Sequence, residues 1–158
     1  MFSPGIEQRL GERNTPLLVN IAYIQEFFWD GGVSSLDQQI LAPIENPLEM
    51  DFDINKVVDR LKQNPTYVHK FKESYDKEPS VYTLTRAISC FERSQIGGKS
   101  RYDTYLQNKD TNALTMSEKH GPELFFNDEG DCFHCHNGFN FTDNSFTSKG
   151  GQNSALHA

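Results

Sequence analysis

The sequence predicts an all-α fold, and two patterns support this prediction. From residue 35 onward, residues that favour helix N-caps precede segments whose apolar side chains recur at helical spacing. No segment shows sustained alternation of apolar and polar residues with β-branched enrichment, which is the pattern of a half-buried strand. With 158 residues, 36% of them hydrophobic, the chain is long enough to bury a core.

Two short helices are expected in the first third of the chain. Ser35 can cap a helix over residues 36–40 that ends before Pro43. Asn46-Pro47 combines a cap residue with a proline that fits the first helical position, which predicts a brief helix over residues 48–50.

Three longer helices follow, and their predicted caps are Asp53, Asn64 and Ser80. The lone Cys90 belongs to the third of these helices and is expected to be small, buried and unreactive. The predicted core-facing positions of the three helices are Ile54, Val57, Val58, Leu61, Tyr67, Val68, Phe71, Leu84, Ala87, Ile88 and Phe91.

Two further helices are expected after Gly97-Gly98, which ends the third long helix. Ser100 can cap a short helix. Thr115 and Glu118 have the spacing of a capping box, in which each side chain bonds the other's backbone N–H. This pair predicts a helix from residue 115 towards Phe126.

The polar stretch 108–112 is the expected domain boundary, which divides the chain into residues 1–108 and 109–158. The second part is short for an independent core. Residues 1–20 and 137–158 are rich in Gly, Pro, Asn, Ser or Thr and predict loops.

The composition excludes several classes of function. Fifteen Lys and Arg against 22 Asp and Glu give a net charge of −7, so we expect no nucleic-acid partner, because phosphate binding relies on basic side chains. No run approaches the roughly 20 apolar residues of a membrane helix. Residues 1–10 lack the basic start and apolar stretch of a secretory signal, and three cysteines are too few for a disulfide scaffold.

The most informative motif is Cys132-Phe133-His134-Cys135-His136, which has the C-x-x-C-H spacing of c-type haem attachment. Residues i and i+3 lie on one face of a helical turn. Both sulfurs can therefore reach the two vinyl groups of one porphyrin. His136 can then place its imidazole on the haem iron as the proximal ligand.

Three other interpretations of this motif stay open. A structural zinc site needs a second ligand pair, and Cys90, His69, His120 and His157 form none at suitable spacing. A thioredoxin-like redox pair needs a βαβ setting, which the pattern lacks. The third interpretation is a chance match with buried, inert thiols.

A series of short segments extends along nearly the whole chain around this motif. They are Arg13-Asn14-Thr15-Pro16, Asn20–Tyr23, Phe27–Gly31, Leu36–Gln39, Pro43–Met50, Ala87-Ile88, Phe91–Arg93, Gly121, Leu124-Phe125 and Phe141-Thr142-Asp143. In this order and spacing, the chain resembles the bacterial di-haem cytochrome c peroxidase family, which includes the MauG-type enzymes.

The resemblance implies two cytochrome c-like domains, each holding a haem c. Peroxide would react at the N-terminal haem, and electrons would enter at the C-terminal one. Residues 1–108 would be the remainder of the N-terminal domain, and residues 109–158 the beginning of the second. The resemblance also implies hydrogen peroxide as substrate, a small cytochrome c or similar protein as electron donor, a periplasmic location and a homodimer when the protein is complete.

The resemblance also implies roles for single residues. Trp29 resembles the tryptophan that relays electrons between the haems. Gln39 and Glu49 resemble the distal pair that positions peroxide and moves its proton. Asn14 resembles a ligand of a calcium ion between the domains, and His136 resembles the proximal ligand of the electron-accepting haem, which is attached at the two motif cysteines.

The expected chemistry of Glu49 has a physical basis. Cleaving the O–O bond needs a proton moved from the iron-bound oxygen to the leaving oxygen, which a carboxylate in a desolvated pocket can do as base and then acid. Glu49, between Leu48 and Met50, is expected to be buried for this purpose, and Gln39 would orient the substrate without titrating. Taken alone, Glu49 also fits a first-turn helix carboxylate, Trp29 a packing residue and Gln39 a solvated helix position.

The chain departs from the family pattern at several points. The family's first C-x-x-C-H lies upstream of the Asn14 segment. A distal histidine often follows a Ser-x-Gly, but here Ser3-Pro4-Gly5 is followed by Ile6. Gly32 stands where the family often has arginine, and the methionine that usually completes the second haem lies further along than this sequence extends. We therefore expect a peroxidase fragment with a partial fold, which is inactive by itself.

Two classes of function follow from the sequence. The first is an enzyme that reduces peroxide, or a MauG-type di-haem oxidase. The second is a mono-haem electron-transfer module without peroxidase activity. Peroxide turnover by the complete protein would separate the two classes.

Overall fold

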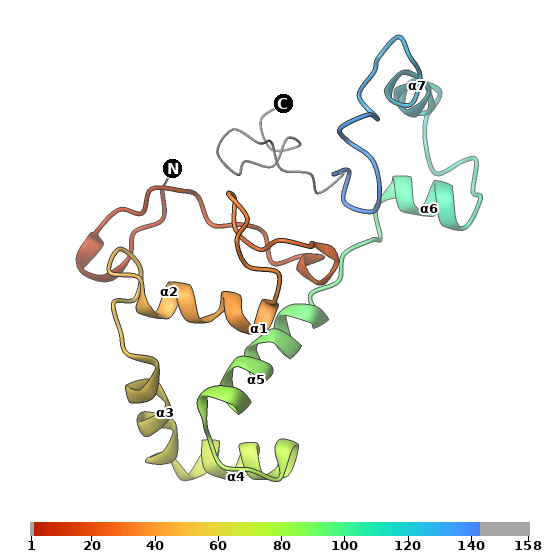
Figure 1. The fold of residues 1–158 in the computed structure, drawn as a ribbon. Helices are drawn as coiled ribbons and strands as arrows, with labels where there is room; N and C mark the ends of the chain where they lie inside the picture. Colours follow the sequence, from red (N-terminus) through yellow and green to blue (C-terminus); the bar gives the residue numbers. More distant parts are fainter. Residues whose placement is uncertain (1, 143–158) are drawn as a thin grey trace. The chain divides into compact units, whose positions relative to one another are not determined.

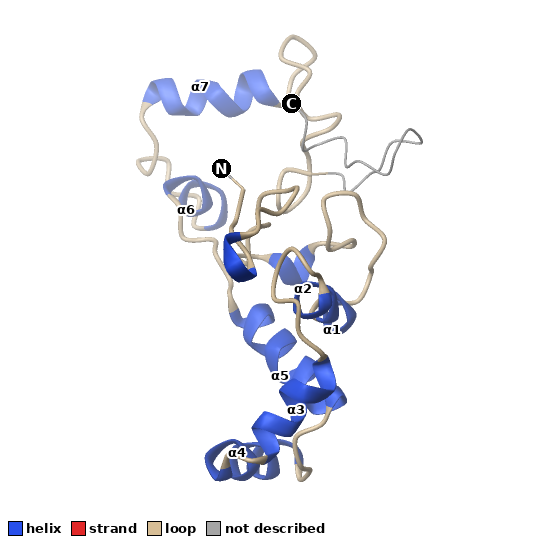
Figure 2. Cartoon of the chain, turned by 90° about the vertical axis from the view of Figure 1, so that its left-hand side faces the viewer, coloured by secondary structure: helices blue, strands red, loops and turns tan. Residues whose placement is uncertain are grey.

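The computed structural model describes residues 2–142 and confirms the predicted helical fold (Figures 1 and 2). Within this range, the only β-type pairing is a single bridge between Pro4 and Leu10. None of the described helices is long and apolar enough to cross a membrane. Residues 143–158, which include Asp143, His157 and most of the predicted C-terminal loop, lie outside the described range.

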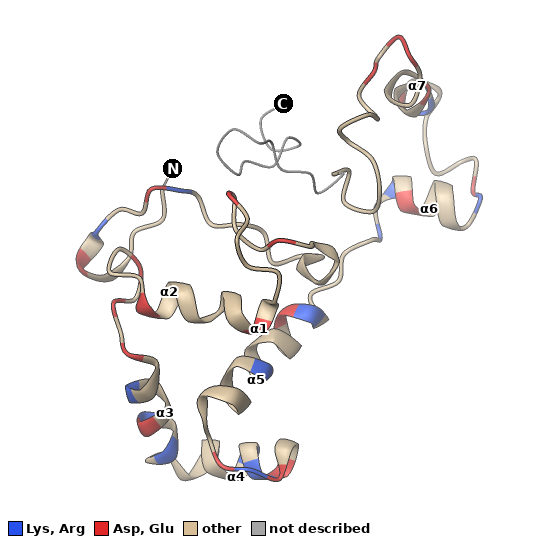
Figure 3. Cartoon of the chain, in the orientation of Figure 1, with Lys and Arg blue, Asp and Glu red and all other residues tan. Residues whose placement is uncertain are grey.

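The described elements are the 3-10 turns η1 (Ile6–Gln8) and η2 (Ile21–Tyr23), and the helices α1 (Leu36–Gln39), α2 (Leu41–Glu45), α3 (Ile54–Lys62), α4 (Pro65–Tyr75), α5 (Val81–Ser94), α6 (Arg101–Gln107) and α7 (Met116–Phe125). They form two compact units, residues 1–95 and 96–158. The boundary predicted at residues 108 and 109 falls inside the second unit, and the assignment of the two parts to two haem domains stays a prediction. Figure 3 shows Lys and Arg interspersed with Asp and Glu along the helices.

The predicted caps are confirmed at five helices. The side chains of Asp53, Asn64, Ser80, Ser100 and Thr115 each accept a backbone N–H in the first turn of their helix. Ser35 precedes α1 as predicted, but its side chain makes no such bond. Local pairing between a cap and the next two or three residues therefore sets where most helices begin.

The short helices differ from the prediction in two ways. Helix α1 ends at Gln39, before Pro43, as predicted, but an unpredicted helix, α2, follows and includes Pro43. Proline is tolerated in the first turn because the N–H groups there have no helical partner in any case. Residues 47–50 form a turn rather than a helix. The backbone N–H of Met50 donates to the carbonyl of Pro43 (3.1 Å), and that of Phe52 donates to Ile44 (2.8 Å), so this segment folds back onto α2.

Two apolar clusters form the core of the first unit. The larger one joins α2, α3, α4 and α5 through Ile40, Ile44, Ile54, Val58, Phe71 and Leu84. The smaller one holds Ile21, Phe27 and Leu36 under η2 and α1.

Helix α5 buries a polar stripe as well as an apolar one. Thr85, Ser89 and Glu92 are buried, whereas Cys90 and Phe91, both expected inside, are exposed. The buried face of α5 includes this polar stripe because α5 packs on α1 and η2 as well as on α3. Phe91 instead lines an open, apolar groove of about 340 Å³.

A polar contact joins α1 to α5. The hydroxyl of Ser89 is fully buried and donates to the Asp37 carboxylate, and Arg93 donates to Ser89 Oγ (2.7 Å) and to Asp37 Oδ1 (3.4 Å). The Ser89 hydroxyl and the Arg93 guanidinium lower the pKa of Asp37. The charged carboxylate is therefore the form that this contact stabilises.

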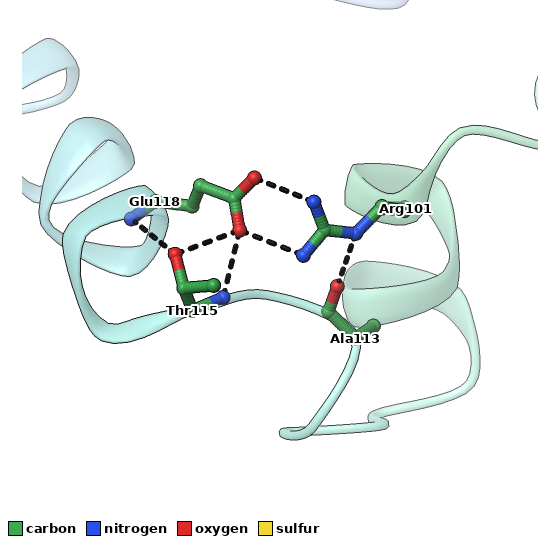
Figure 4. A network of polar contacts seen from close by, with 4 residues as sticks. All are labelled: Arg101, Ala113, Thr115 and Glu118. Atoms are coloured by element: carbon green, nitrogen blue, oxygen red, sulfur yellow. Dashed lines mark hydrogen bonds and ion pairs between the residues drawn. The ribbon is translucent and has the colours of Figure 1, made fainter.

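In the second unit, one carboxylate holds the start of α7 (Figure 4). Glu118 accepts two hydrogen bonds from the Arg101 guanidinium (2.6 and 2.7 Å) and two more from the backbone N–H and hydroxyl of Thr115 (both 2.8 Å). Arg101 also donates to the carbonyl of Ala113 (2.9 Å). Hydrogen bonds from Thr115 and Arg101 lower the pKa of Glu118 to about 2.

We predict that Ser89→Ala lowers the free energy of unfolding by about 1–3 kcal/mol, the usual cost of leaving buried polar partners unpaired. Urea unfolding of the purified chain measures the effect. Ser94→Ala is the matched control, because Ser94 is exposed at the end of the same helix and should change stability by less than about 0.5 kcal/mol. Equal losses in both variants would contradict the structural importance of the Ser89 contact.

We also predict that ionisation of Glu118 makes the stability of the folded chain depend on pH. Because its pKa is about 2 in the folded chain and ordinarily 4.5, its stabilising effect is complete above pH 4.5 and is lost as the pH falls towards 2. Glu118→Gln should therefore cost stability above this window, and the difference from the wild type should vanish across it. Urea unfolding at a series of pH values tests this, with the exposed neighbour change Ser117→Ala expected to behave as wild type.

Candidate haem site and associated residues

The haem motif folds as a single helical turn. The backbone N–H groups of Cys135 and His136 donate to the carbonyl of Cys132 (3.3 and 2.9 Å), and the Asn137 amide donates to the carbonyl of Phe133 (3.0 Å). Cys132 is half-buried and Cys135 is exposed, and both are free thiols. A turn of this kind brings the two sulfurs to one side, as attachment to one porphyrin requires.

The segment that leads from α7 into the motif has little freedom. The Asn127 side chain accepts from the backbone N–H groups of Glu129 and Gly130 (both 2.9 Å), and Asp131 N–H donates to the Asn127 carbonyl (3.0 Å). A Cβ at Gly130 would lie 1.9 Å from the carbonyl oxygen of Leu124, so only glycine allows this approach. The end of α7 therefore determines where Cys132 begins the turn.

The imidazole of His136 is oriented for metal binding. Its Nδ1 lies 3.2 Å from the backbone oxygen of Phe141, and a carbonyl can only accept, so Nδ1 carries the proton. In the neutral ring this leaves the Nε2 lone pair for a metal. The turn, the two thiols and this tautomer together fit a c-type haem.

The alternatives for the motif find little support in the described residues. Residues 2–142 contain no group of three or more His, Cys, Asp or Glu side chains that could hold a metal ion. They also contain no βαβ unit around Cys132 and Cys135. His134, the other histidine of the motif, is exposed and contacts Asp131 instead.

The structure brings together two of the predicted residues, Trp29 and Asn14. The Trp29 indole N–H donates to the backbone carbonyl of Asn14 (2.6 Å), and the neighbouring side chains Arg13 and Asp30 form an ion pair (2.8 Å). Trp29 is half-buried, whereas the Asn14 side chain is exposed. Two adjacent contacts thus join segments that lie about fifteen residues apart.

The loop that carries Trp29 is closed at its base. Phe27 N–H donates to the carbonyl of Val33 (2.9 Å), and Gly32 N–H donates to the Glu26 carboxylate (3.1 Å). Gly32 has a φ of 96°, a conformation that glycine tolerates and arginine does not readily adopt. The absence of the family's arginine at this position therefore agrees with the local backbone.

Gln39 and Glu49 lie on separate local structures. Gln39 is the half-buried last residue of α1, the helix that Asp37 ties to α5. Glu49 lies in the turn after α2, and no hydrogen bond joins it to Gln39 within the described part of the chain.

The expected burial of Glu49 is wrong for this chain, because its side chain is exposed. Its backbone, in contrast, is closely held. Its carbonyl accepts from Ile6 N–H (2.6 Å), and a Cβ at Gly5 would lie 2.0 Å from the oxygen of Leu48. The N-terminal loop thus holds the backbone of the turn, while the carboxylate points outward and accepts a 3.3 Å bond from the Asn46 amide.

Sequence reasoning missed the residues that position these side chains. Asp37 and Arg93 lie in the family segments but carry no predicted role, and Ser89 lies outside those segments. A serine among the apolar residues of a strongly amphipathic helix, three or four residues from an arginine, is the available signal. Ser89 bonds Asp37 on α1, which lies 52 positions away in the sequence, so this contact cannot be read from neighbouring residues.

Comparison with known proteins identifies the family. The family model for di-haem cytochrome c peroxidase matches residues 1–111. Methylamine utilization protein MauG of Methylorubrum extorquens is 34% identical over 153 residues, which cover 92% of this chain and 43% of that protein. Cytochrome c peroxidase Ccp of Escherichia coli is 33% identical over 149 residues, covering 94% of this chain and 31% of that protein.

A solved structure shows the same fold. The crystal structure of a MauG-like protein associated with microbial copper homeostasis matches with a TM-score of 0.79 and 26% identity, over 93% of this chain and 45% of that one. The chain spans less than half the length of each of these relatives. The predicted all-α, cytochrome c-like fold class is confirmed, and the chain belongs to the di-haem cytochrome c peroxidase family.

Proposed function

We propose that this chain is a haem-binding part of an enzyme that reduces hydrogen peroxide to water in the periplasm, with electrons from a small c-type cytochrome. The observation that carries the proposal is the helical turn of Cys132, Cys135 and His136 in a chain of this family. Relatives called cytochrome c peroxidase, at 33–35% identity, support the reaction. Homodimerisation of the complete protein stays a prediction.

In the proposed site, Cys132 and Cys135 would hold the haem through thioether bonds, and His136 Nε2 would bind its iron. When bound, the haem supplies one-electron transfer through that iron. The Phe141 carbonyl accepts a hydrogen bond from His136 Nδ1–H and so leaves Nε2 available for the metal. The reaction consumes two electrons and two protons for each peroxide, which yields two water molecules.

The remaining roles rest on the family resemblance. Glu49 would take a proton from peroxide and return it to the leaving oxygen, and Gln39 would orient the substrate. Trp29 would relay electrons, and its bond to the carbonyl of Asn14 supports a common role for the two segments.

Within residues 2–142, no cluster of acidic side chains accompanies Asn14 to complete a calcium site. Asn14 offers one side-chain oxygen, whereas calcium takes six to eight oxygen ligands. The described residues hold no acidic cluster that could add the others. Asn14 as a calcium ligand therefore stays a prediction.

A MauG-type oxidase is the second candidate. It is favoured by the 34% identity to MauG of Methylorubrum extorquens and by the likeness to a MauG-like structure. The mono-haem electron-transfer module is the third candidate, because this sequence holds one C-x-x-C-H motif. Peroxide turnover with a reduced small cytochrome as the only donor separates the peroxidase from both.

We predict covalent haem at Cys132 and Cys135. The 158-residue chain, produced with a haem c attachment system, should stain for haem on a denaturing gel, and the Cys132→Ala/Cys135→Ala variant should not. His134→Ala is the matched control within the motif and should keep the stain. Staining that persists without the two cysteines would contradict the assignment.

We predict that Glu49→Gln lowers peroxide turnover about 100-fold to 10,000-fold in a complete protein containing this chain, because glutamine cannot move the proton. Haem content should be unchanged. Glu45→Gln, at the exposed end of α2, is the control and should retain wild-type turnover. Stopped-flow measurement of the first oxidised species decides the matter, and an unchanged rate would give Glu49 a structural role only.

A further inference from the structure

Phe141 has an unusual backbone conformation beside the proposed haem ligand. Its φ is 53°, in the left-handed region that bulky residues rarely adopt. Such a conformation is unfavourable for a bulky residue and persists only where the surroundings hold it. The carbonyl of this same residue accepts the Nδ1 proton of His136 (3.2 Å). The strained residue is therefore the one that orients the ligand.

Two aromatic rings from different helices hold Phe141. Tyr102 of α6 lies 6.0 Å from it between ring centroids, at an interplanar angle of 43°. Phe125, the last residue of α7, meets it edge to face at 5.7 Å and 84°. Phe125 also lies 6.5 Å from the His136 imidazole. The separations of Tyr102 and of Phe125 from Phe141 are within the range of favourable aromatic pairs.

Tyr102 belongs to helix α6, which several side-chain contacts hold in place. Its neighbour Arg101 forms the two-pronged ion pair with Glu118 at the start of α7. Ser100 and Asp103 cap the same helix reciprocally. Tyr102 itself is half-buried. Helix α6 can therefore act as a fixed support against which Phe141 packs.

We propose that Tyr102 is a positioning residue for His136. Its ring keeps Phe141 in the left-handed conformation, so that the Phe141 carbonyl holds the Nδ1 proton and Nε2 stays directed at the iron. This inference rests on the proposed haem attachment at His136. A carbonyl acceptor on Nδ1 makes the imidazole a stronger donor, which favours the oxidised iron. Loss of the Tyr102 ring should therefore raise the midpoint potential.

The test uses the whole 158-residue chain with haem attached and measures the midpoint potential by spectroscopic redox titration. Tyr102→Leu should shift the reduction equilibrium about tenfold towards the reduced form, which is about 59 mV for one electron. Tyr102→Phe keeps the ring and should restore the wild-type potential. Tyr105→Leu changes the other tyrosine of α6, which has no ring contact with Phe141, and should leave the potential unchanged.

Haem content, read from the pyridine haemochrome spectrum, separates the two proposals. If the wild type carries no haem, the proposed function fails, and ¹⁵N NMR of His136 in the haem-free chain decides the inference. An Nδ1–H tautomer that is lost in Tyr102→Leu would support it, and an identical ring signal in both would overturn it.

In haem-loaded protein, an unchanged potential in folded Tyr102→Leu overturns the inference, as does an equal shift in Tyr105→Leu. If Tyr102→Leu does not fold, Tyr102→Met retains most of the volume without an aromatic ring and is judged by the same outcomes.

Discussion

A buried hydroxyl organises the first unit. Ser89 on α5 donates to Asp37 on α1, and Arg93, one helical turn later on α5, donates to the Ser89 hydroxyl. Burying polar groups costs free energy unless they are hydrogen-bonded, so this contact permits α5 to turn a polar stripe inward. The next buried position, Glu92, has an oxygen without a partner among the described residues, and burial raises its pKa. The position of α1, and with it Gln39, follows from the part of the stripe that is satisfied.

The sequence predicts what depends on near neighbours. Caps such as Asp53 and Thr115 were predictable because each bonds backbone groups two or three residues ahead. The buried polar stripe of α5 was not predictable. Nothing in the neighbouring sequence distinguishes Ser89 from a solvent-exposed serine, since its burial depends on α1, which is distant in the sequence. The same reason applies to Cys90 and Phe91, which fit a helical apolar pattern but are exposed. Phe91 lies at an open groove lined by residues of α3 and α4, and no further element in the described part of the chain covers it.

The candidate site shows the same difference between local contacts, which the sequence predicts, and long-range contacts, which it does not. The motif from Cys132 to His136 is predictable because the spacing of its ligands is itself the geometry of a helical turn. The link between Trp29 and Asn14 crosses a loop, and the sequence shows only that both residues belong to family segments. The exposure of Glu49 depends on how the N-terminal loop meets the turn after α2, where Gly5 approaches the backbone closely.

The two units thus hold their predicted site residues in place by different kinds of contact. A side chain at the end of a helix, or just beyond it, inherits little rigidity from that helix, so a predicted site residue there needs a second contact from elsewhere in the chain. For Gln39, the second contact is the hydrogen bond from Ser89 of α5 to Asp37, which lies two residues before Gln39 on α1. For His136, it is a carbonyl whose own backbone is strained and held by rings. Because such contacts involve residues that carry no reactive group, substitutions at Ser89 or Phe141 should alter a site that they do not enter.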